Sequence, residues 1–327
     1  MSSRLKWTIA IGILLLLLGM LLSIQIGAKD ISTSEILKAF FQFEGTMHDQ
    51  LIMNVRLPRM LAGVFVGGLL AMSGSMMQGV MRNPLADPSL LGVNQGATLM
   101  VAISSVLWVQ GGVFTNFFMA LLGACISGGC ILLFTIKNIY KQGITPILLA
   151  GTAMSMFFLS LASIVALIGN RSQELAFWIA GGFRQVTWDQ LWLLLIVGSV
   201  CSLMAYRLAS KINILSMGDE ASISLGISPE KVKIKMILWM IPICAVCVAV
   251  AGNIGFVGLF IPHIMRKVIG NDYRILMPLS FLYGSIVLVF ADIAARMLSA
   301  PYELPVGLFS ACIGVPAFLI LVQKEKR

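Results

Sequence analysis

Residues 60–80 read MLAGVFVGGLLAMSGSMMQGV, a run of 21 residues without a charged side chain. The hydrocarbon core of a bilayer needs about 20 apolar residues per helix, and only helices and closed barrels satisfy the backbone there. The run lacks the in-and-out alternation of a lipid-facing strand, so a barrel is excluded. The stretch therefore predicts a membrane-spanning helix.

Similar apolar runs recur along the chain. They are Ile9–Ile26, Leu90–Val109, Phe114–Ile136, Ile147–Ile168, Leu191–Tyr206, Leu276–Leu298 and Val306–Val322. Hydrophobic residues make up 58% of the 327 residues and charged residues 11%, with a mean hydropathy of +0.94. Arg4 and Lys6 precede the first run as in a signal peptide, but Leu21–Ala28 offers no convincing cleavage site, so this run is predicted to be the first span.

The run from Met236 to Met265 is either one tilted helix or two, because Gly252, Gly255 and Pro262 interrupt it. With two helices, 16 of the 23 Lys and Arg residues lie on the cytoplasmic side, against 11 with one helix. The positive-inside rule favours two. The cytoplasmic set is Arg4, Lys6, Arg82, Lys137, Lys141, Arg207, Lys211, Lys231, Lys233, Lys235, Arg266, Lys267, Arg274, Lys324, Lys326 and Arg327.

Residues 1–327 are therefore predicted to form one all-α, polytopic membrane domain of about ten spans with both termini in the cytoplasm. The basic isoelectric point of about 9.4 follows from this topology and calls for no nucleic-acid partner. No phosphate-binding loop of the form G-x-x-x-x-G-K-[ST] occurs. No clustered acid, base, nucleophile or metal ligands occur either, so we expect no enzyme activity, no metal site and no cofactor on this chain.

Asp292 is the one carboxylate within the predicted spans, and it lies one helical turn before Arg296. Such a pair is read either as mutual neutralisation or as part of an ion relay, which would need more partners. An ion-coupled transporter is thus disfavoured. If the chain transports uphill, we expect its energy to come from another subunit.

The longest cytoplasmic break, about residues 209–235, is polar and mixed in charge. Asp219 or Ser228 can cap a short helix, Gly226 can end one, and Pro229 suits a first helical turn. We interpret this segment as two short helices joined at Gly226, the alternative being an ordinary solvated loop. The candidate residues for contact with another subunit are Gly218, Asp219, Glu220, Leu225, Gly226, Pro229 and Glu230.

Two proline-containing stretches interrupt the spans. Asn83-Pro84 and Asp87-Pro88 predict a stiff cytoplasmic turn that transmits motion rather than absorbing it. In the last span we expect interruptions of the helix that line a pathway. Backbone groups without helical hydrogen bonds are tolerated at membrane depth only where they face protein or a water-filled path. The alternative is that these kinks serve packing only. The interrupting residues are Pro305, Gly307, Gly314 and Pro316.

Three arginines lie near the outer ends of apolar helices, although most of the positive charge is inside. Arg56 and Arg59 flank a helix entrance and can present neighbouring guanidiniums to carboxylates, with Arg296 in support. The alternative is anchoring to lipid headgroups.

The motifs together resemble the FecCD/BtuC family of permease subunits, the membrane part of bacterial ABC importers for ferric siderophores, haem and vitamin B12. The matching motifs, in order, are Arg56-Leu57-Pro58-Arg59, Ala71-Met72-Ser73-Gly74, Arg82-Asn83-Pro84-Leu85-Ala86-Asp87-Pro88, Leu225-Gly226, Gly255-Phe256-Val257-Gly258-Leu259 with Pro262-His263-Ile264-Met265-Arg266, Ala291-Asp292, and Glu303-Leu304-Pro305-Val306-Gly307 with Gly314-Val315-Pro316.

The resemblance implies a ten-helix subunit in a bacterial cytoplasmic membrane that pairs with a second permease, the same chain or a related one. It implies two ATPase subunits that hold ATP and Mg, and an external substrate-binding protein or lipoprotein. The Gly218–Glu230 segment matches the family's coupling helices, and Arg56, Arg59 and Arg296 match arginines that meet acidic residues of the binding protein. The expected cargo is an iron–siderophore-type chelate. The alternatives are vitamin B12 or haem import and, from another class, a stand-alone secondary transporter.

Overall fold

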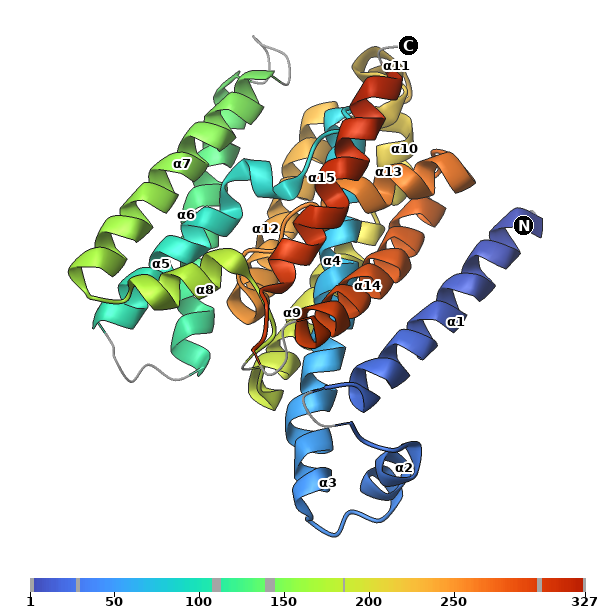
Figure 1. Cartoon of the computed structure of the whole chain (residues 1–327). Helices are drawn as coiled ribbons and strands as arrows, with labels where there is room; N and C mark the ends of the chain where they lie inside the picture. The colour runs from blue at the N-terminus through green and yellow to red at the C-terminus, as the bar shows by residue number, and fades with distance from the viewer. Residues whose placement is uncertain are drawn as a thin grey trace.

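The structure, a computed structural model, describes residues 3–27, 30–107, 113–138, 145–184, 186–298 and 302–325. Every regular element in these ranges is helical (Figure 1). Ten helices coincide with the predicted spans: α1 (Ser3–Gln25), α4 (Leu57–Met81), α5 (Val93–Leu107), α6 (Val113–Asn138), α7 (Thr145–Ile168), α9 (Trp188–Tyr206), α12 (Pro229–Ala251), α13 (Val257–Ile269), α14 (Tyr273–Met297) and α15 (Val306–Glu325). Of the predicted cytoplasmic cations, Lys141, Lys326 and Arg327 lie outside the described residues.

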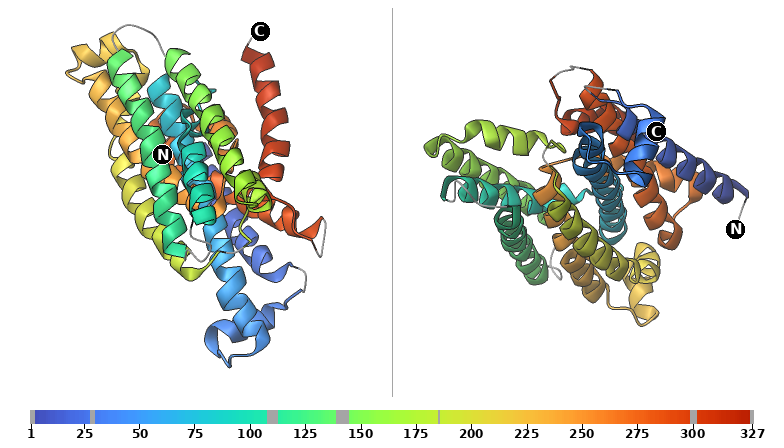
Figure 2. Two further views of the ribbon diagram at one scale, coloured as in Figure 1. Left: turned by 90° about the vertical axis from the view of Figure 1, so that its left-hand side faces the viewer. Right: turned by 90° about the horizontal axis from the view of Figure 1, so that it is seen from below.

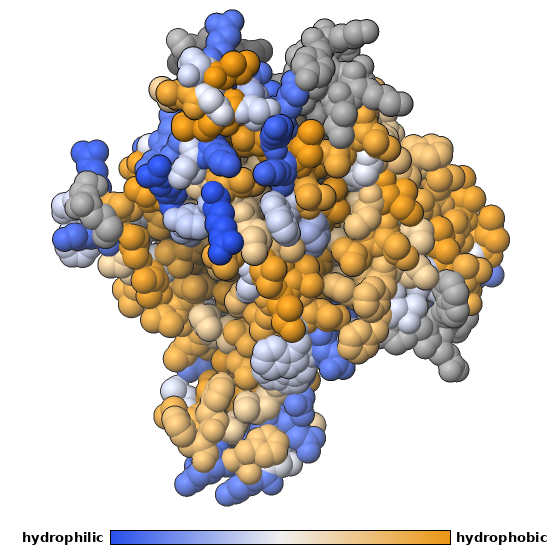
Figure 3. Space-filling view, turned by 180° about the vertical axis from the view of Figure 1, so that it is seen from behind, coloured by the Kyte–Doolittle hydropathy of each residue, from blue (hydrophilic) through white to orange (hydrophobic). Residues whose placement is uncertain are grey.

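Seven described helices are long and apolar enough to cross a bilayer by length and composition. They are α1, the continuous segment Met47–Met81, α6, α7, α9, α12 and α14; α5 is a shorter apolar helix, as is the Val306–Ala317 part of α15. The large side chains left exposed on α1, α6, α7 and α9 are those of a lipid-facing surface, for example Leu14, Leu122, Met156 and Ile196. Figure 3 shows this apolar belt, with hydrophilic residues gathered at the two ends.

The long apolar run 236–265 forms two helices, as the charge distribution predicted. Helix α12 ends at Ala251 and α13 begins at Val257. Gly252 and Phe256, at the two sides of the break, both have a positive φ, of 66° and 68°. A Cβ at Gly252 would meet the carbonyl oxygen of Trp178, so glycine is needed there.

Helix α4 is the centre of the bundle and contacts α9, α12, α13 and α14. Its glycines allow these helices to approach backbone to backbone. A Cβ at Gly74 would overlap the carbonyl group of Gly258 in α13, and one at Gly67 would overlap that of Gly284 in α14. The glycines of α4 therefore form a helix-packing surface.

The helices form two groups with α12 between them (Figures 1 and 2). Helices α5, α6 and α7 contact one another on one side, while α13 and α14 pack on α4 on the other, with α1 against the outer face of α14. Helix α12 contacts α4 and α9 as well as α5 and α6. Segments that enter between the two groups can therefore line a cavity.

Several short helices were not predicted as elements. At one end of the bundle lie α2 (Thr33–Phe41), α3 (Met47–Leu51) and the π-helical turn η1 (Ile52–Arg56), and we call this the α2 end. Helix α8 (Ser172–Ala180) and the 3₁₀ turn η2 (Pro88–Leu91) connect longer helices. Glu35 in α2 closes a capping box with Ser32, and the hydrogen bonds from the Ser32 backbone and side chain lower the Glu35 pKa to about 2.

The opposite end carries α10 (Ala209–Ser216) and α11 (Asp219–Ser224), and residues 209–228 are called the knob below. Both chain termini point toward this knob end in Figure 1, as an even number of crossings requires. Gly226, with a φ of 74°, joins the helix that begins at Asp219 to the helix that begins at Pro229, as predicted. The second of these helices was expected to be short, but it continues as the 23-residue α12, and a further short helix, α10, precedes Gly218.

Candidate functional site

A cavity of about 490 Å³ lies where the two helix groups meet. Its lining comes from η2, α5, the end of α8, the α12–α13 break and the start of α15. The residues are Ser89, Gln95, Ile179, Ala180, Asn253, Gly255, Phe256, Pro305, Gly307, Leu308 and Ala311. Its volume falls within the range of about 300–1,000 Å³ that small-molecule sites usually have.

Three interruptions of the helices meet at this cavity and are joined by backbone hydrogen bonds. The Asn253 N–H donates to the Trp178 carbonyl at 2.9 Å, and the Gly182 N–H donates to the Ala251 carbonyl at 2.8 Å. The Val306 N–H donates to the Gly181 carbonyl at 3.0 Å. Irregular backbone within a membrane protein is tolerated where it is buried in protein or lines a water-filled path. Three such segments therefore meet at the cavity.

The predicted pathway residues separate into two groups. Pro305 and Gly307 line the cavity at the start of α15. The expected interruption of the last helix was wrong, because α15 continues from Val306 to Glu325 with Pro316 inside it. Gly314 instead provides a close contact, since a Cβ there would meet the side chain of Phe256. A positive φ at a bulky residue such as Phe256 is costly, and such strain is concentrated at functional sites.

The α2 end holds an ion network in which Arg59, Asp292 and Arg296 are buried, Glu303 is partly exposed and Arg184 is exposed. Arg59 Nη2 lies 2.9 Å from Asp292 Oδ1, and Arg59 Nη1 lies 2.8 Å from Glu303 Oε1. The predicted pair of Asp292 and Arg296 is present, with Arg296 Nε 3.2 Å from Asp292 Oδ2. Arg184 Nε lies 3.6 Å from Glu303 Oε2. The network thus ties α4 and α14 to the loops before α9 and before α15.

The three predicted docking arginines are buried in this chain, at 6% exposure for Arg56 and 7% for Arg59 and Arg296. Arg56 and Arg59 were expected to present neighbouring guanidiniums to carboxylates, and in the structure both already have partners within the chain. Arg56 Nη1 donates to the Ile24 and Gln25 carbonyls near the end of α1, where carbonyls lack helical partners. Arg59 is held by its two carboxylates. Sequence alone gave no sign of these partners, because Asp292 is 233 residues away from Arg59.

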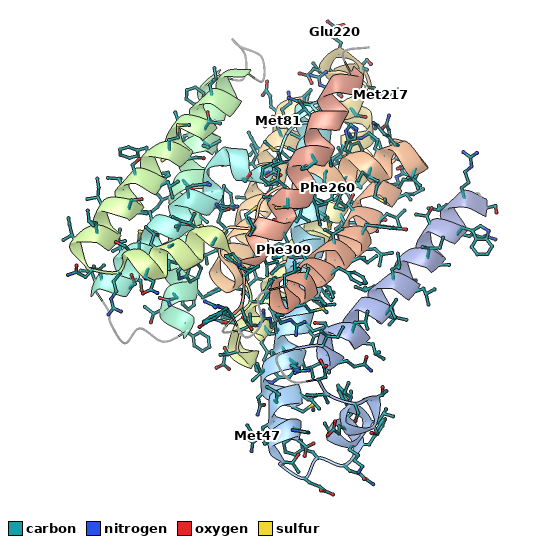
Figure 4. All side chains as sticks on the ribbon, in the orientation of Figure 1. Met47, Met81, Met217, Glu220, Phe260 and Phe309 are labelled. Atoms are coloured by element: carbon teal, nitrogen blue, oxygen red, sulfur yellow. The ribbon has the colours of Figure 1, made fainter. Side chains whose placement is uncertain are left out.

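The knob presents an apolar surface at the other end of the molecule. Met217, Ile223 and Leu225 are 73%, 63% and 61% exposed. Figure 4 shows Met217 and Glu220 at the tip. Pro229 occupies the first turn of α12, capped by Ser228, as predicted. Outside the bilayer, exposed large apolar side chains that gather in one place are typical of a protein contact.

The base of the knob is held to the bundle by polar contacts. Asn213 Nδ2 donates to Asp272 Oδ1 at 2.6 Å, and this hydrogen bond is the main reason that the Asp272 pKa is lowered. Asn213 Oδ1 accepts from the Tyr273 N–H at 2.7 Å. These hydrogen bonds connect the knob to the start of α14.

The predicted turn at Asn83, Pro84, Asp87 and Pro88 forms a compact connection. The Asn83 side chain accepts from the Leu85 N–H, and Asp87 accepts from the Ser89 N–H at 2.8 Å to cap η2. Burial raises the pKa of the Asp87 carboxyl, and the hydrogen bonds from Ser89, which act to lower this pKa, only partly offset the effect of burial.

An ion pair joins the turn to the knob. Arg82 Nη2 lies 2.9 Å from Asp219 Oδ1, and Lys233 Nζ lies 3.2 Å from Asp219 Oδ2. A second cavity, of about 440 Å³, lies beside the Arg82 side chain, and its lining includes Arg82, Arg266 and Lys267.

Sequence reasoning missed the polar lining of the cavity. Gln95 and Asn253, which line it, and Asn94, which contacts Asn253, are neutral amides within or beside apolar runs. Ionisable groups at membrane depth are the usual sign of a functional site, and neutral amides within an apolar run are a weaker sign of the same kind. Within the described residues, no group of three or more His, Cys, Asp or Glu side chains is placed to hold a metal ion.

The chain matches the model of the FecCD transport family over residues 15–324. It is 40% identical to the iron(3+)-hydroxamate import system permease protein FhuB of Bacillus subtilis (strain 168), over 100% of this chain and 88% of the relative. It is 36% identical to the Fe(3+)-citrate import system permease protein YfmD of the same organism, over 99% and 96%. The hemin transport system permease protein HmuU of Yersinia pestis is 34% identical over 100% and 99%.

The fold has a solved counterpart. A metal-chelate type ABC transporter in an inward-facing conformation superposes with a TM-score of 0.86 at 29% sequence identity, covering 98% of this chain and 99% of that one.

Proposed function

The chain belongs to the FecCD transport family, and from this premise we propose that it is the membrane-spanning permease subunit of a bacterial ABC importer that moves an iron–siderophore-type chelate into the cytoplasm. The proposal is carried by the family match, which extends over nearly the whole chain. The cavity built where three helix interruptions meet is consistent with a transport pathway. ATP and Mg would be bound by a separate ATPase subunit. A second permease, the same chain or a related one, would complete the pathway.

We place the knob end in the cytoplasm. Most Lys and Arg residues belong to segments at this end, in keeping with the positive-inside rule. The exposed side chains of Met217, Ile223 and Leu225 form an apolar surface that an ATPase subunit can bind. Because the knob is anchored through Asn213 and Asp272, a push on it would move the bundle.

A continuous set of contacts connects the knob to the cavity. Asp219 at the start of α11 pairs with Arg82, and Arg82 begins the turn that ends in η2. Ser89 of η2 and Gln95 of α5 line the cavity. We propose that movement of the knob reaches the cavity through this turn.

Cells that lack this chain test the proposal of chelate import. They should lose high-affinity uptake of radioactive iron supplied as a ferric siderophore, and uptake should return when the chain is expressed again. Haem is the second candidate cargo, because of the full-length similarity to the hemin permease. Restored growth on haem, with siderophore uptake the same in both strains, would favour haem and refute the chelate proposal.

We propose that the α2 end docks the external binding protein through the charge of Arg56, Arg59 and Arg296. The three arginines and Arg184 outnumber their neighbours Asp292 and Glu303, so this cluster carries a net positive charge, although Asp30, Glu35, Glu44 and Asp49 lie at the same end. Acidic groups on a partner would be steered to it and would compete with Glu303, whose side chain is 31% exposed.

Replacing Glu303 with Gln should therefore speed association of the binding protein, and replacing Arg56 with Glu should slow it. Rates measured at several salt concentrations should show a flatter salt dependence for Arg56→Glu. Lys38→Glu, an exposed change of the same charge in α2, serves as the control for non-specific charge effects. Wild-type association rates in both the Arg56 and Glu303 variants would show that the network is purely structural.

A further inference from the structure

The second cavity, of about 440 Å³, lies at the knob end between α4, α10, α13 and the start of α14, and its lining is basic. Arg82, Arg266 and Lys267 supply three cations, and no carboxylate side chain is among the described lining residues. Within the described part of the chain, only Arg82 of these three has an ion-pair partner, which is Asp219. The cavity therefore has an excess of positive charge that an anionic ligand would neutralise. The other lining residues are Gln78, Gly79, Asn83, Pro84, Ser216, His263, Asn271 and Tyr273.

Two neutral groups hold the Arg266 guanidinium in place at the floor of this cavity. Arg266 Nη2 donates to Gln78 Oε1 at 3.0 Å and to the Tyr273 hydroxyl at 3.3 Å. Gln78 is buried, and its amide is fixed in turn because its Nε2 donates to the Leu259 carbonyl of α13 at 2.9 Å. These contacts orient the Arg266 guanidinium without neutralising its charge.

The end of α13, which carries Arg266 and Lys267, also exposes apolar side chains. Ile264 and Val268 are both exposed and lie one helical turn apart, so they share a face of the helix beside Lys267. Figure 1 shows this end of α13 on the side of the bundle where α1 begins, and Trp7 of α1 is exposed there. Tryptophan is enriched where a membrane meets water. The cavity therefore lies near the headgroup layer of the leaflet on the knob side.

We propose that the second cavity binds the phosphate group of an anionic lipid from the cytoplasmic leaflet, with Arg266 and Lys267 as its principal binding residues. Guanidinium and ammonium groups form charge-assisted hydrogen bonds with phosphate oxygens, and basic pockets between membrane helices on the cytoplasmic side suit anionic headgroups. A soluble phosphate would use the same cations but would gain nothing from Ile264 and Val268, which offer a surface to acyl chains. The inference goes beyond the proposed transport function and requires only that the knob end face the cytoplasm.

The test measures lipid binding to the purified full-length chain in detergent by native mass spectrometry. Dioleoyl-phosphatidylglycerol should bind about tenfold more tightly than dioleoyl-phosphatidylcholine, which has the same acyl chains and no net charge. Lys267→Glu should remove most of this preference. Lys211→Glu, the same change at an exposed position of the knob outside the lining, should leave the preference nearly unchanged and controls for non-specific attraction. Arg266→Gln and the exposed Arg207→Gln form a second pair of variants with the same expected contrast.

A large excess of inorganic phosphate distinguishes the two sources of a phosphate group. Phosphatidylglycerol should stay bound in its presence, whereas displacement of the lipid would assign the cavity to a soluble anion and refute the inference. Equal losses of preference in Lys267→Glu and Lys211→Glu would overturn it too, because the lipid would then be attracted by surface charge alone.

Equal binding of the two lipids to the wild type would also refute the inference. Weaker association of the ATPase subunit with Lys267→Glu would then assign the cavity to a protein contact. None of these measurements depends on iron uptake, so a failure of this inference is distinguishable from a failure of the proposed function.

Discussion

Replacing Ile223 and Leu225 together with aspartate should abolish substrate-stimulated ATP hydrolysis while the chain still inserts into the membrane. Both side chains are more than 60% exposed at the tip of the knob, and neither stabilises the bundle. Apolar anchors at the centre of a protein contact are often worth about 2 kcal/mol or more each, which is roughly a 30-fold weaker association. Burying two new carboxylates in the same contact adds to the loss.

The measurement is ATP hydrolysis and iron uptake by the purified importer with saturating loaded binding protein. Ile223→Leu with Leu225→Met keeps the apolar surface and should behave as wild type. A further variant at Gly226, whose φ of 74° disfavours bulky residues, should show the same uncoupling when changed to Arg. Stimulated hydrolysis and uptake at wild-type levels in the aspartate variant would show that the ATPase contact lies elsewhere.

Replacing Asp292 with Asn should strongly destabilise the folded chain. The Asp292 carboxylate accepts hydrogen bonds from Arg59 and forms an ion pair with Arg296, and all three side chains are less than 10% exposed. Removing one partner of a buried ion pair leaves an uncompensated charge and typically costs about 3–5 kcal/mol. Glu303→Gln removes an equal charge from a partly exposed side chain of the same network, and should cost about 1 kcal/mol or less.

The two variants can be compared by thermal unfolding of the detergent-solubilised protein followed by size-exclusion chromatography. Asp292→Asn should show a much lower apparent melting temperature and a lower yield than Glu303→Gln. Equal melting temperatures of the two variants would mean that the buried Asp292 stabilises the folded chain no more than the partly exposed Glu303 does.

The spans could be predicted because the bilayer imposes one simple requirement, a long apolar helix. The run 60–80 corresponds to α4, and the break within 236–265 was predicted from the charge distribution and is found at Gly252–Phe256. The first turn of α12 followed from Ser228 and Pro229, whose preferences are local. Such features depend on residues close together in the chain.

Tertiary partners could not be predicted in the same way. The sequence does not show which groups bind the Arg59 guanidinium. Its carboxylate partners, Asp292 and Glu303, lie far along the chain. The helix that begins at Pro229 was expected to be short, but it continues into the apolar run as α12, and the short helix α10 before Gly218 was not predicted. The last helix passes through Pro316 without a break, since one missing backbone donor is tolerated inside a helix of a membrane bundle.

The most direct test of the account is iron uptake by proteoliposomes that contain this chain, with and without its partner subunits. With the ATPase subunits, the second permease and the loaded binding protein present, we predict accumulation of the ferric chelate that requires ATP hydrolysis and is insensitive to dissipation of proton and sodium gradients. The chain without the ATPase subunits should accumulate none. Accumulation by the chain alone, driven by an ion gradient, would contradict the account and identify a secondary transporter.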